Sequence, residues 1–256
     1  MKKVSYTLIA CLLSVGLAAC SSNDAKQDKQ NDSANSKETT QADQKEQQKQ
    51  MEEMQKKLDA QKIDDQKVVA TVNKDKITGS EYNSALSTIQ GQLQQSGQDP
   101  TSKEGAKAVK KQTIDALVGQ ELILQDAEKN GYKASDKQVD KQLKEEKKQF
   151  KDNAQFEEAL KKSGLTMDQL KSDIADSIKY SQYVDKEIKS ASVSEKDVKA
   201  YYDQYAEQMK KQKQKAPDFK DVKSQIKKQL ESQEKQKEVQ KEIDQLKKSA
   251  KIDVSI

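Results

Sequence analysis

One apolar segment, residues 109–131, limits what this chain can fold into more than any other. It reads VKKQTIDALVGQELILQDAEKNG, and its large apolar side chains spread most of the way around a helix at about 100° per residue. A helix that is apolar on nearly all sides must be surrounded by other elements. Asn130-Gly131 is a C-terminal stop, because glycine readily adopts the left-handed conformation that ends helices. We therefore expect a buried central helix with an architectural role.

The segments around this helix predict amphipathic helices that begin at polar caps. Capping patterns occur at residues 78–81, 135–138, 166–169 and 194–197. The apolar stripes that follow are Tyr82, Leu86, Ile89 and Leu93; Val139, Leu143 and Phe150; Met167, Leu170, Ile174, Ile178 and Ile188; and Val198, Tyr201, Tyr202, Tyr205 and Met209. A shorter helix around Phe156 is closed by Gly164. The repeated order of cap, stripe and stop predicts a mainly α fold.

Two further segments predict a small β element and an unusual last helix. Residues 68–77 read as a β-hairpin, and residues 251–256 alternate like a strand that pairs with it. The last helix, from about Pro217 to Ser249, carries one apolar face in its first half and another, rotated by about 180°, in its second half. Either this helix bends near residues 231–238, or one long helix packs against two different surfaces.

Composition removes several classes of site. Histidine is absent, which excludes a Ser-His-Asp triad, a His-ligated zinc and a histidine general base. Both cysteines, Cys11 and Cys20, lie before residue 21, so the body has no thiol nucleophile or metal ligand. The formal charge is only +4, or +2 without Lys2 and Lys3, and there is no arginine. We therefore expect no nucleic-acid partner, no metal and no cofactor.

The N-terminus predicts a secretory signal with a lipid anchor. Residues 1–19 combine a basic start with an apolar run from Leu8 that is too short for a comfortable membrane span. The run ends Leu17-Ala18-Ala19-Cys20, which closely resembles a bacterial lipobox. That resemblance implies cleavage between Ala19 and Cys20 and acylation of the Cys20 thiol. Two acyl chains suffice for stable anchoring, so we expect the mature protein on the outer face of a bacterial cytoplasmic membrane.

Residues 20–66 predict a tether between this anchor and the folded domain. As far as about residue 50 the segment has no large apolar side chain that could offset chain entropy, so disorder is expected. About 30 such residues reach roughly 30 Å. Met51, Met54 and Leu58 favour a short helix within residues 45–62. The folded domain is expected over residues 67–256.

The order and spacing of several segments resemble the SurA N-terminal-domain family, which includes SurA and the lipid-anchored PrsA-type foldases of Gram-positive bacteria. The resemblance covers roughly Val68 to Ile256. Its segments are Val72–Thr78, Leu117–Ala127, Gly131–Asp136, Leu160–Thr166, Val193–Tyr202 and Phe219–Ile252. It implies a SurA-N/trigger-factor-like helical chaperone cradle, mainly α with a small β-hairpin and C-terminal strand. In such a cradle an apolar groove holds unfolded, newly exported polypeptides.

One departure from the family changes what the resemblance implies. PrsA-type proteins carry a parvulin prolyl-isomerase domain between the tyrosine-rich helix and the last helix, whereas here residues 209–216 occupy that place. Parvulin sites also use histidine pairs, and this chain has none. The resemblance therefore implies the chaperone part alone, without catalytic residues. Tyrosines and a methionine on the two predicted helices before the last one are candidate client contacts. A tyrosine joins an apolar ring to a polar hydroxyl, which suits clients of varied sequence. The candidate residues are Tyr180, Tyr183, Tyr201, Tyr202, Tyr205 and Met209.

Other functions remain open beside a chaperone that holds unfolded clients. One is a residual prolyl isomerase, as the family names suggest. Another is a scaffold whose apolar face binds one folded envelope protein. The sequence is also compatible with a homodimer. A solute-binding lipoprotein is not expected, because alternating βαβ units are absent from the sequence pattern.

Overall fold

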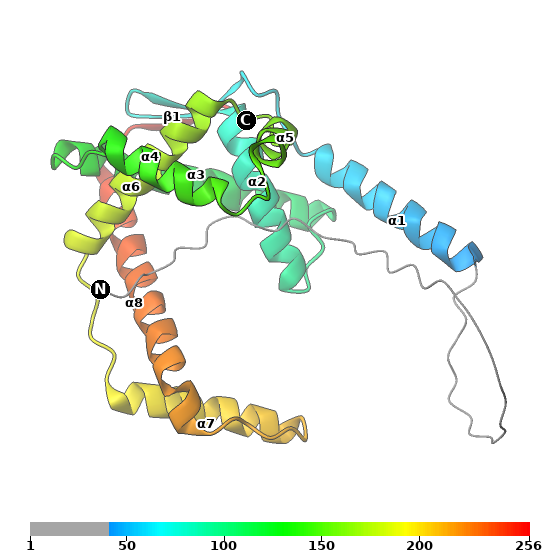
Figure 1. The fold of residues 1–256 in the computed structure, drawn as a ribbon, viewed down its shortest axis with the longest axis vertical. Coiled ribbons are helices and arrows are strands. Elements are labelled where there is room, and N and C mark those ends of the chain that lie inside the picture. Colours follow the sequence, from blue (N-terminus) through cyan, green and yellow to red (C-terminus); the bar gives the residue numbers. More distant parts are fainter. Residues whose placement is uncertain (1–40) are drawn as a thin grey trace. The chain divides into compact units, whose positions relative to one another are not determined.

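The computed structural model describes residues 41–256, which form eight helices and three strands (Figure 1). In chain order they are α1 (Gln41–Asp59), β1 (Val68–Val72), β2 (Asp75–Thr78), α2 (Gly79–Gln95), α3 (Lys103–Lys129), α4 (Asp136–Lys147), α5 (Asn153–Lys162), α6 (Met167–Lys186), α7 (Glu195–Lys211), α8 (Phe219–Ser249) and β3 (Ile252–Val254). The prediction of a mainly α fold with a small β element is confirmed. The predicted signal, the cleavage site at Ala19 and the lipidation site at Cys20 lie outside the described residues.

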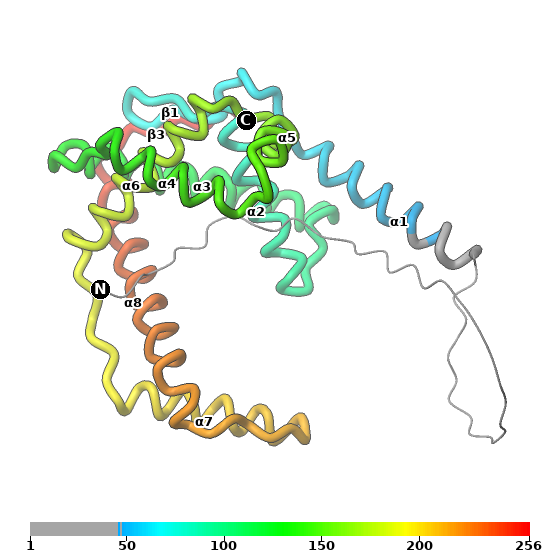
Figure 2. The backbone as a smooth tube through the Cα atoms, viewed as in Figure 1, coloured from blue at the N-terminus to red at the C-terminus, as the bar shows by residue number. Residues whose placement is uncertain are grey.

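The three strands form one antiparallel sheet in the order β2-β1-β3. Val72 of β1 lies opposite Asp75 of β2 on one side and opposite Ile252 of β3 on the other. The hairpin turns at Asn73, whose φ of 59° is a left-handed conformation that asparagine adopts more readily than most residues. Both the hairpin and its pairing with the C-terminal strand occur as predicted, and Figure 2 shows β1 and β3 side by side.

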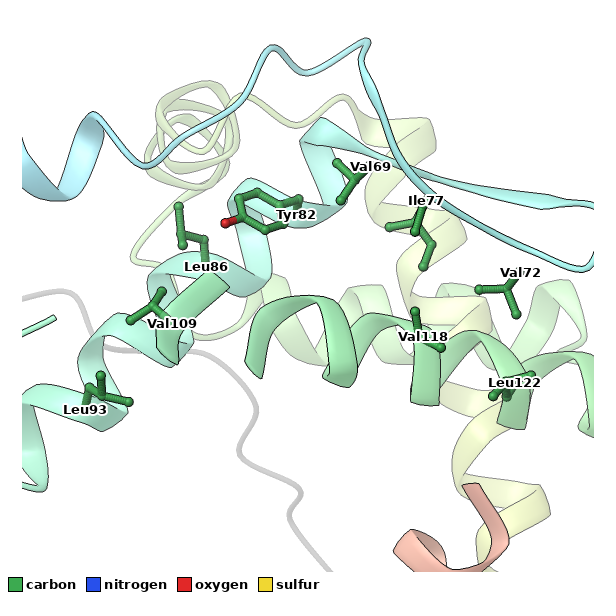
Figure 3. Close-up of a cluster of buried hydrophobic side chains, with 10 residues drawn as sticks. Val69, Val72, Ile77, Tyr82, Leu86, Leu93, Val109, Val118 and Leu122 are labelled. Atoms are coloured by element: carbon green, nitrogen blue, oxygen red, sulfur yellow. The ribbon is translucent and has the colours of Figure 1, made fainter. Parts of the chain in front are cut away.

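An apolar cluster fills the space between the sheet and helices α2 and α3 (Figure 3). Val69 and Val72 of β1, Tyr82 and Leu86 of α2, and Val109 of α3 are at most 2% exposed. Burying each side chain of this kind contributes about 1.5–3 kcal/mol. The helix α2 starts at the predicted capping box, in which the Glu81 carboxylate accepts hydrogen bonds from Thr78. This cluster therefore fixes the hairpin to the helical body.

Helix α3 is the central helix that the sequence predicts. It packs against β1, α2, α6 and α8, and Val118, Leu122 and Ile123 are at most 3% exposed. It ends at the predicted stop, where Gly131 has a φ of 84° and Asn130 forms the cap. The helix is shielded on several sides because different neighbours cover its different faces.

Helices α4, α5 and α6 share a smaller cluster of their own. Val139, Leu143, Phe156 and Ile174 form its buried centre. The stripe expected on α6 is shorter than predicted, because the helix ends at Lys186 and Ile188 lies in the following connection. Ile188 is nevertheless buried, in a cluster that includes side chains of α3 and α8.

Helix α8 is one continuous helix from Phe219 to Ser249, as the second alternative for this helix requires. Its first half packs against α7 and its second half against α3. Helices α3 and α8 pack closely at Gly119 of α3, where an added Cβ would lie 3.0 Å from Ile243 Cδ1. The single helix α8 therefore packs against α7 with its N-terminal half and against the central helix α3 with its C-terminal half.

Candidate functional site

Helix α7 and the first half of α8, residues 195–230, form a two-helix unit that we call the arm. Its helix α7 starts at Ser194, whose backbone N–H donates to Asp197 Oδ2 at 2.9 Å. The hydrogen bond from the Ser194 hydroxyl lowers the pKa of the Asp197 carboxyl. Val198 and Ile226 are the fully buried residues of the arm, at 0% and 5% exposure. The arm thus has a small core, since two helices alone can cover only one face of each other.

Two of the predicted contact residues help to hold the arm together. The Tyr202 ring lies 5.1 Å from the Phe219 ring, and its hydroxyl donates to the Pro217 carbonyl at 2.8 Å. The Tyr201 hydroxyl accepts a hydrogen bond from Gln229 Nε2 at 2.9 Å. Both tyrosines are half-buried. Each therefore has a structural role and still presents part of its ring to solvent.

Tyr205 and Met209 continue the stripe that begins at Val198, and both are half-buried. The substantial contacts of α7 are with α8, so no third element of residues 41–256 covers this stripe extensively. On the facing helix, Val222 and Leu230 are also half-buried. The structure thus brings four of the six predicted residues, Tyr201, Tyr202, Tyr205 and Met209, onto one arm together with apolar side chains of α8.

The other two predicted residues lie on α6. This helix belongs to the part of the protein outside the arm, which we call the body. Tyr183 is 3% exposed, and its hydroxyl donates to Asp126 Oδ2 at 2.6 Å. Burial, followed by that hydrogen bond, raises the pKa of the Tyr183 hydroxyl. Its ring also packs edge-on against the Tyr132 ring at 5.8 Å. Tyr183 has almost no surface to offer a partner in this conformation, whereas Tyr180 is half-buried and keeps some.

One cavity of the protein has a polar lining. It has a volume of about 340 Å³ and opens between the ends of α3 and α6 and the second half of α8. Its lining includes Asp126, Glu187, Glu238 and Glu242, with Lys241 paired to Glu238 at 2.6 Å. Apolar client segments have little to gain from such a lining. The half-exposed stripe on the arm is therefore the better candidate for apolar contacts.

Carboxylates of α2, α3, α6 and the hairpin lie close enough for their charges to raise pKa values among them. Burial and the nearby carboxylates of Asp75 and Glu81 raise the pKa of Glu121. Burial and the charge of Asp176 likewise raise the pKa of Asp173. Within residues 41–256, however, no group of three or more Asp, Glu, His or Cys side chains is arranged to hold a metal ion. In the same residues, no helix is long and apolar enough to cross a membrane.

Sequence reasoning did not include the α8 side of the arm among the contact residues. Phe219, Val222 and Leu230 share a face with Ile226, and this periodicity was visible in the sequence. The sequence did not show that this face meets the tyrosines, because that depends on the turn at residues 212–218. The range 209–216, predicted to stand in place of the isomerase domain, overlaps the end of α7, which continues to Lys211.

Comparison with known proteins finds a family model that matches part of the chain. Residues 59–184 match the family model described as the SurA-like N-terminal domain. This match runs from the end of α1 into α6 and stops before the arm. A solved structure described as a SurA-like chaperone of Campylobacter jejuni aligns with 73% of this chain and 98% of its own, at 12% identity and a TM-score of 0.44.

Curated relatives match over about half of the chain. Foldase protein PrsA of Clostridium perfringens is 32% identical over 153 residues, which are 56% of this chain and 44% of the relative. Foldase protein PrsA of Caldanaerobacter subterraneus is 28% identical over 148 residues, 55% of this chain and 43% of the relative. Chaperone SurA of Chromobacterium violaceum is 30% identical over 134 residues, 52% of this chain and 30% of the relative. The chain thus spans less than half the length of these relatives. Residues 59–184 of the chain are therefore a SurA-like N-terminal domain.

Proposed function

We propose that this protein is an extracytoplasmic chaperone that binds unfolded, newly exported polypeptides through the apolar stripe of its arm, without catalysing a reaction. The observation that carries the proposal is the stripe itself, formed by half-exposed Tyr201, Tyr205 and Met209 on α7 and by Val222 and Leu230 on α8. Relatives of the body are named foldases and chaperones, which supports a role in protein folding.

The chemistry of the stripe suits clients of varied sequence. A tyrosine offers an apolar ring with a polar hydroxyl, and methionine is flexible enough to fit irregular partners. Lysines and carboxylates flank the stripe, for example the ion pair of Lys223 with Glu195 at 2.5 Å. Such charges keep a half-exposed apolar surface soluble, while the exposed parts of its side chains stay available to a client. Tyr180 on α6 is a further contact residue in this proposal, whereas the buried Tyr183 is not.

A lipid anchor at Cys20 is the second part of the proposal. The sequence Leu17-Ala18-Ala19-Cys20 supports it, because it resembles a site of cleavage and acylation. With acyl chains on Cys20, the body would be held at the outer face of the cytoplasmic membrane of a Gram-positive bacterium. Metabolic labelling with a clickable palmitate analogue tests this part. The anchor requires label on the wild-type chain and none on Cys20→Ser.

Absence of catalysis is the third part. The family match is to the N-terminal domain, the connection between α7 and α8 spans only residues 212–218, and the chain has no histidine. A residual prolyl isomerase is the competing function. It requires that the protein accelerate the slow, proline-limited refolding phase of a model substrate. We expect the rate of that phase to stay unchanged at every protein concentration.

Suppression of aggregation tests the client-binding proposal directly. A chemically unfolded client is diluted out of denaturant with the full chain present, and light scattering is followed. We expect suppression at near-stoichiometric ratios, and its loss in the arm variant Tyr205→Ser, Met209→Ser, Leu230→Ser. The matched control is Met51→Ser, Met54→Ser on α1, because these side chains are also exposed, at 66% and 46%.

The control variant should suppress aggregation as well as the wild type, and circular dichroism should show native helix content in both variants. Retained suppression by the arm variant would place client binding elsewhere. If the wild type fails to suppress aggregation but binds one native envelope protein saturably, the scaffold function replaces the chaperone function.

A further inference from the structure

The connection between α7 and α8 forms a basic tip at the end of the arm. Residues 208–217 contain four lysines, Lys210, Lys211, Lys213 and Lys215, and no aspartate or glutamate. Lys220 follows at the start of α8. All five side chains are exposed. Residues 207–221 contain these five lysines and only three acidic residues, whereas positive and negative charges nearly balance over the whole chain.

Local structure explains only part of this lysine content. Lys210 and Lys211 lie in the last turn of α7, where cations stabilise the helix dipole, and Lys211 pairs with Glu207 at 3.2 Å. Lys220 instead lies in the first turn of α8, where a cation is unfavourable. Lys213 has a φ of 57°, a conformation that glycine or asparagine adopts at lower cost. These two lysines are thus placed against local preference.

The turn that presents these lysines is defined by backbone hydrogen bonds. Lys213 N–H donates to the Lys210 carbonyl at 3.0 Å, and Gln214 N–H donates to the Met209 carbonyl at 2.9 Å. No ion pair to Lys210, Lys213, Lys215 or Lys220 is found among residues 41–256. Within the described residues the tip therefore offers four lysines without an ion pair, one at the end of α7, two in the connection and one at the start of α8. They lie at the opposite end of α8 from the sheet (Figure 1).

We propose that this tip binds the anionic headgroups of a phospholipid bilayer. Lysine ammonium groups act as point charges on flexible stems, which suits a laterally mobile charged surface better than a shaped anion pocket. Clusters of four to eight basic residues are typical of sites that bind anionic lipids. The tip has no arginine and no aromatic side chain in residues 208–217, so base stacking by a nucleic acid has no platform there.

Vesicle co-sedimentation with the full chain tests this proposal. Vesicles of phosphatidylcholine alone are compared with vesicles that contain about 30% phosphatidylglycerol. The apolar N-terminal run contributes to binding of both kinds of vesicle. The readout is therefore the ratio of the partition coefficient for anionic vesicles to that for phosphatidylcholine vesicles. The tip variant is Lys210→Gln, Lys213→Gln, Lys215→Gln, Lys220→Gln. The control variant changes four exposed lysines of α4 and α5 to glutamine, and these lysines form no ion pair found among residues 41–256: Lys137, Lys141, Lys144 and Lys161.

We expect the wild type to prefer anionic vesicles, and the preference to disappear at about 0.5 M salt because the Debye length is then short. The tip variant should lose at least about tenfold of this preference, since one lysine near a charged bilayer contributes about fivefold. The control variant should keep most of it. Equal losses in both variants, or no preference in the wild type, would overturn the proposal. So would binding of the wild type to polyglutamate but not to anionic vesicles, which would assign the tip to acidic polypeptides.

Discussion

Gly119→Ala is expected to destabilise the protein, although alanine is the better helix former. In an undisturbed helix the change from glycine to alanine gains about 0.5–1 kcal/mol. Here the added Cβ would lie 3.0 Å from Ile243 Cδ1 and 3.3 Å from Ile243 Cγ2. Carbon atoms attract best at about 3.5–4.0 Å, and overpacking of this kind costs about 1–3 kcal/mol. The difference leaves a net loss of up to about 2.5 kcal/mol in the free energy of unfolding.

Two further variants separate the contact from the helix propensity. Gly91 lies inside α2 and has no heavy atom within 4 Å of an added Cβ, so Gly91→Ala should stabilise by about 0.5–1 kcal/mol. Ile243→Val removes the Cδ1 atom that the new Cβ would meet, and alone it should cost about 0.5–1.5 kcal/mol. Combined with Gly119→Ala it should cost less than the sum of the two single changes, because the shared clash is relieved.

Urea denaturation followed by far-ultraviolet circular dichroism measures the free energy of unfolding of the wild type, the three single variants and the double variant. A similar slope with urea concentration in every variant would show that the unfolded states are comparable. The reasoning is wrong if Gly119→Ala stabilises the protein as much as Gly91→Ala does. It is also wrong if the loss in the double variant equals the sum of the two single losses, because the new Cβ at position 119 would then not contact residue 243 of α8.

Three other changes probe the polar contacts of the body. Tyr183→Phe removes the hydrogen bond to Asp126 and should cost about 1 kcal/mol in urea denaturation at neutral pH. Because the folded state raises the pKa of Tyr183 above 10.0, the wild type should lose stability as the pH rises above about 10, and the variant should lose less over the same titration. Glu121→Gln should raise the thermal midpoint at pH 7, since burial disfavours the charged carboxylate, and the gain should vanish in mild acid; a lower midpoint at pH 7 would contradict this. Asn73→Ala should cost about 2 kcal/mol, because it strains the left-handed turn and removes the acceptor of the Lys251 N–H, whereas Asn73→Gly should cost less; equal losses would show that the backbone conformation is not a factor.

Much of the fold could be predicted because its local signals agree with its packing. Ser194 and Asp197 have the side chains that a capping box requires, and the structure forms that box. The central helix is buried because its apolar residues point in several directions, which only a helix with several neighbours can satisfy. The C-terminal strand was recognisable by alternation, and the partner it pairs with was the one strand-like segment before it.

The candidate site was harder to predict because exposure depends on what lies opposite. Tyr183 and Tyr205 look alike in the sequence, yet one faces Asp126 in the body and the other lies on a two-helix arm. The extent of the stripe on α6 also depended on where the helix ends, and Ile188 packs against α8 from a connection that no helical periodicity describes. Such contacts join residues far apart in the chain, so no local pattern encodes them.

The place of β3 in the sheet has a consequence for the order in which the chain can fold. β1 is the central strand, and one of its two edges is paired only by the last strand of the described chain. The hydrogen bond from Lys251 N–H to Asn73 Oδ1 joins positions 178 residues apart. A ribosome delivers the N-terminal residues first, so β1 keeps one unpaired edge until residues 252–254 have been synthesised. Bare strand edges invite intermolecular pairing, and contacts of such long range slow folding. The sheet can therefore be completed only after β3 has emerged, and until then this protein is itself an incompletely folded polypeptide.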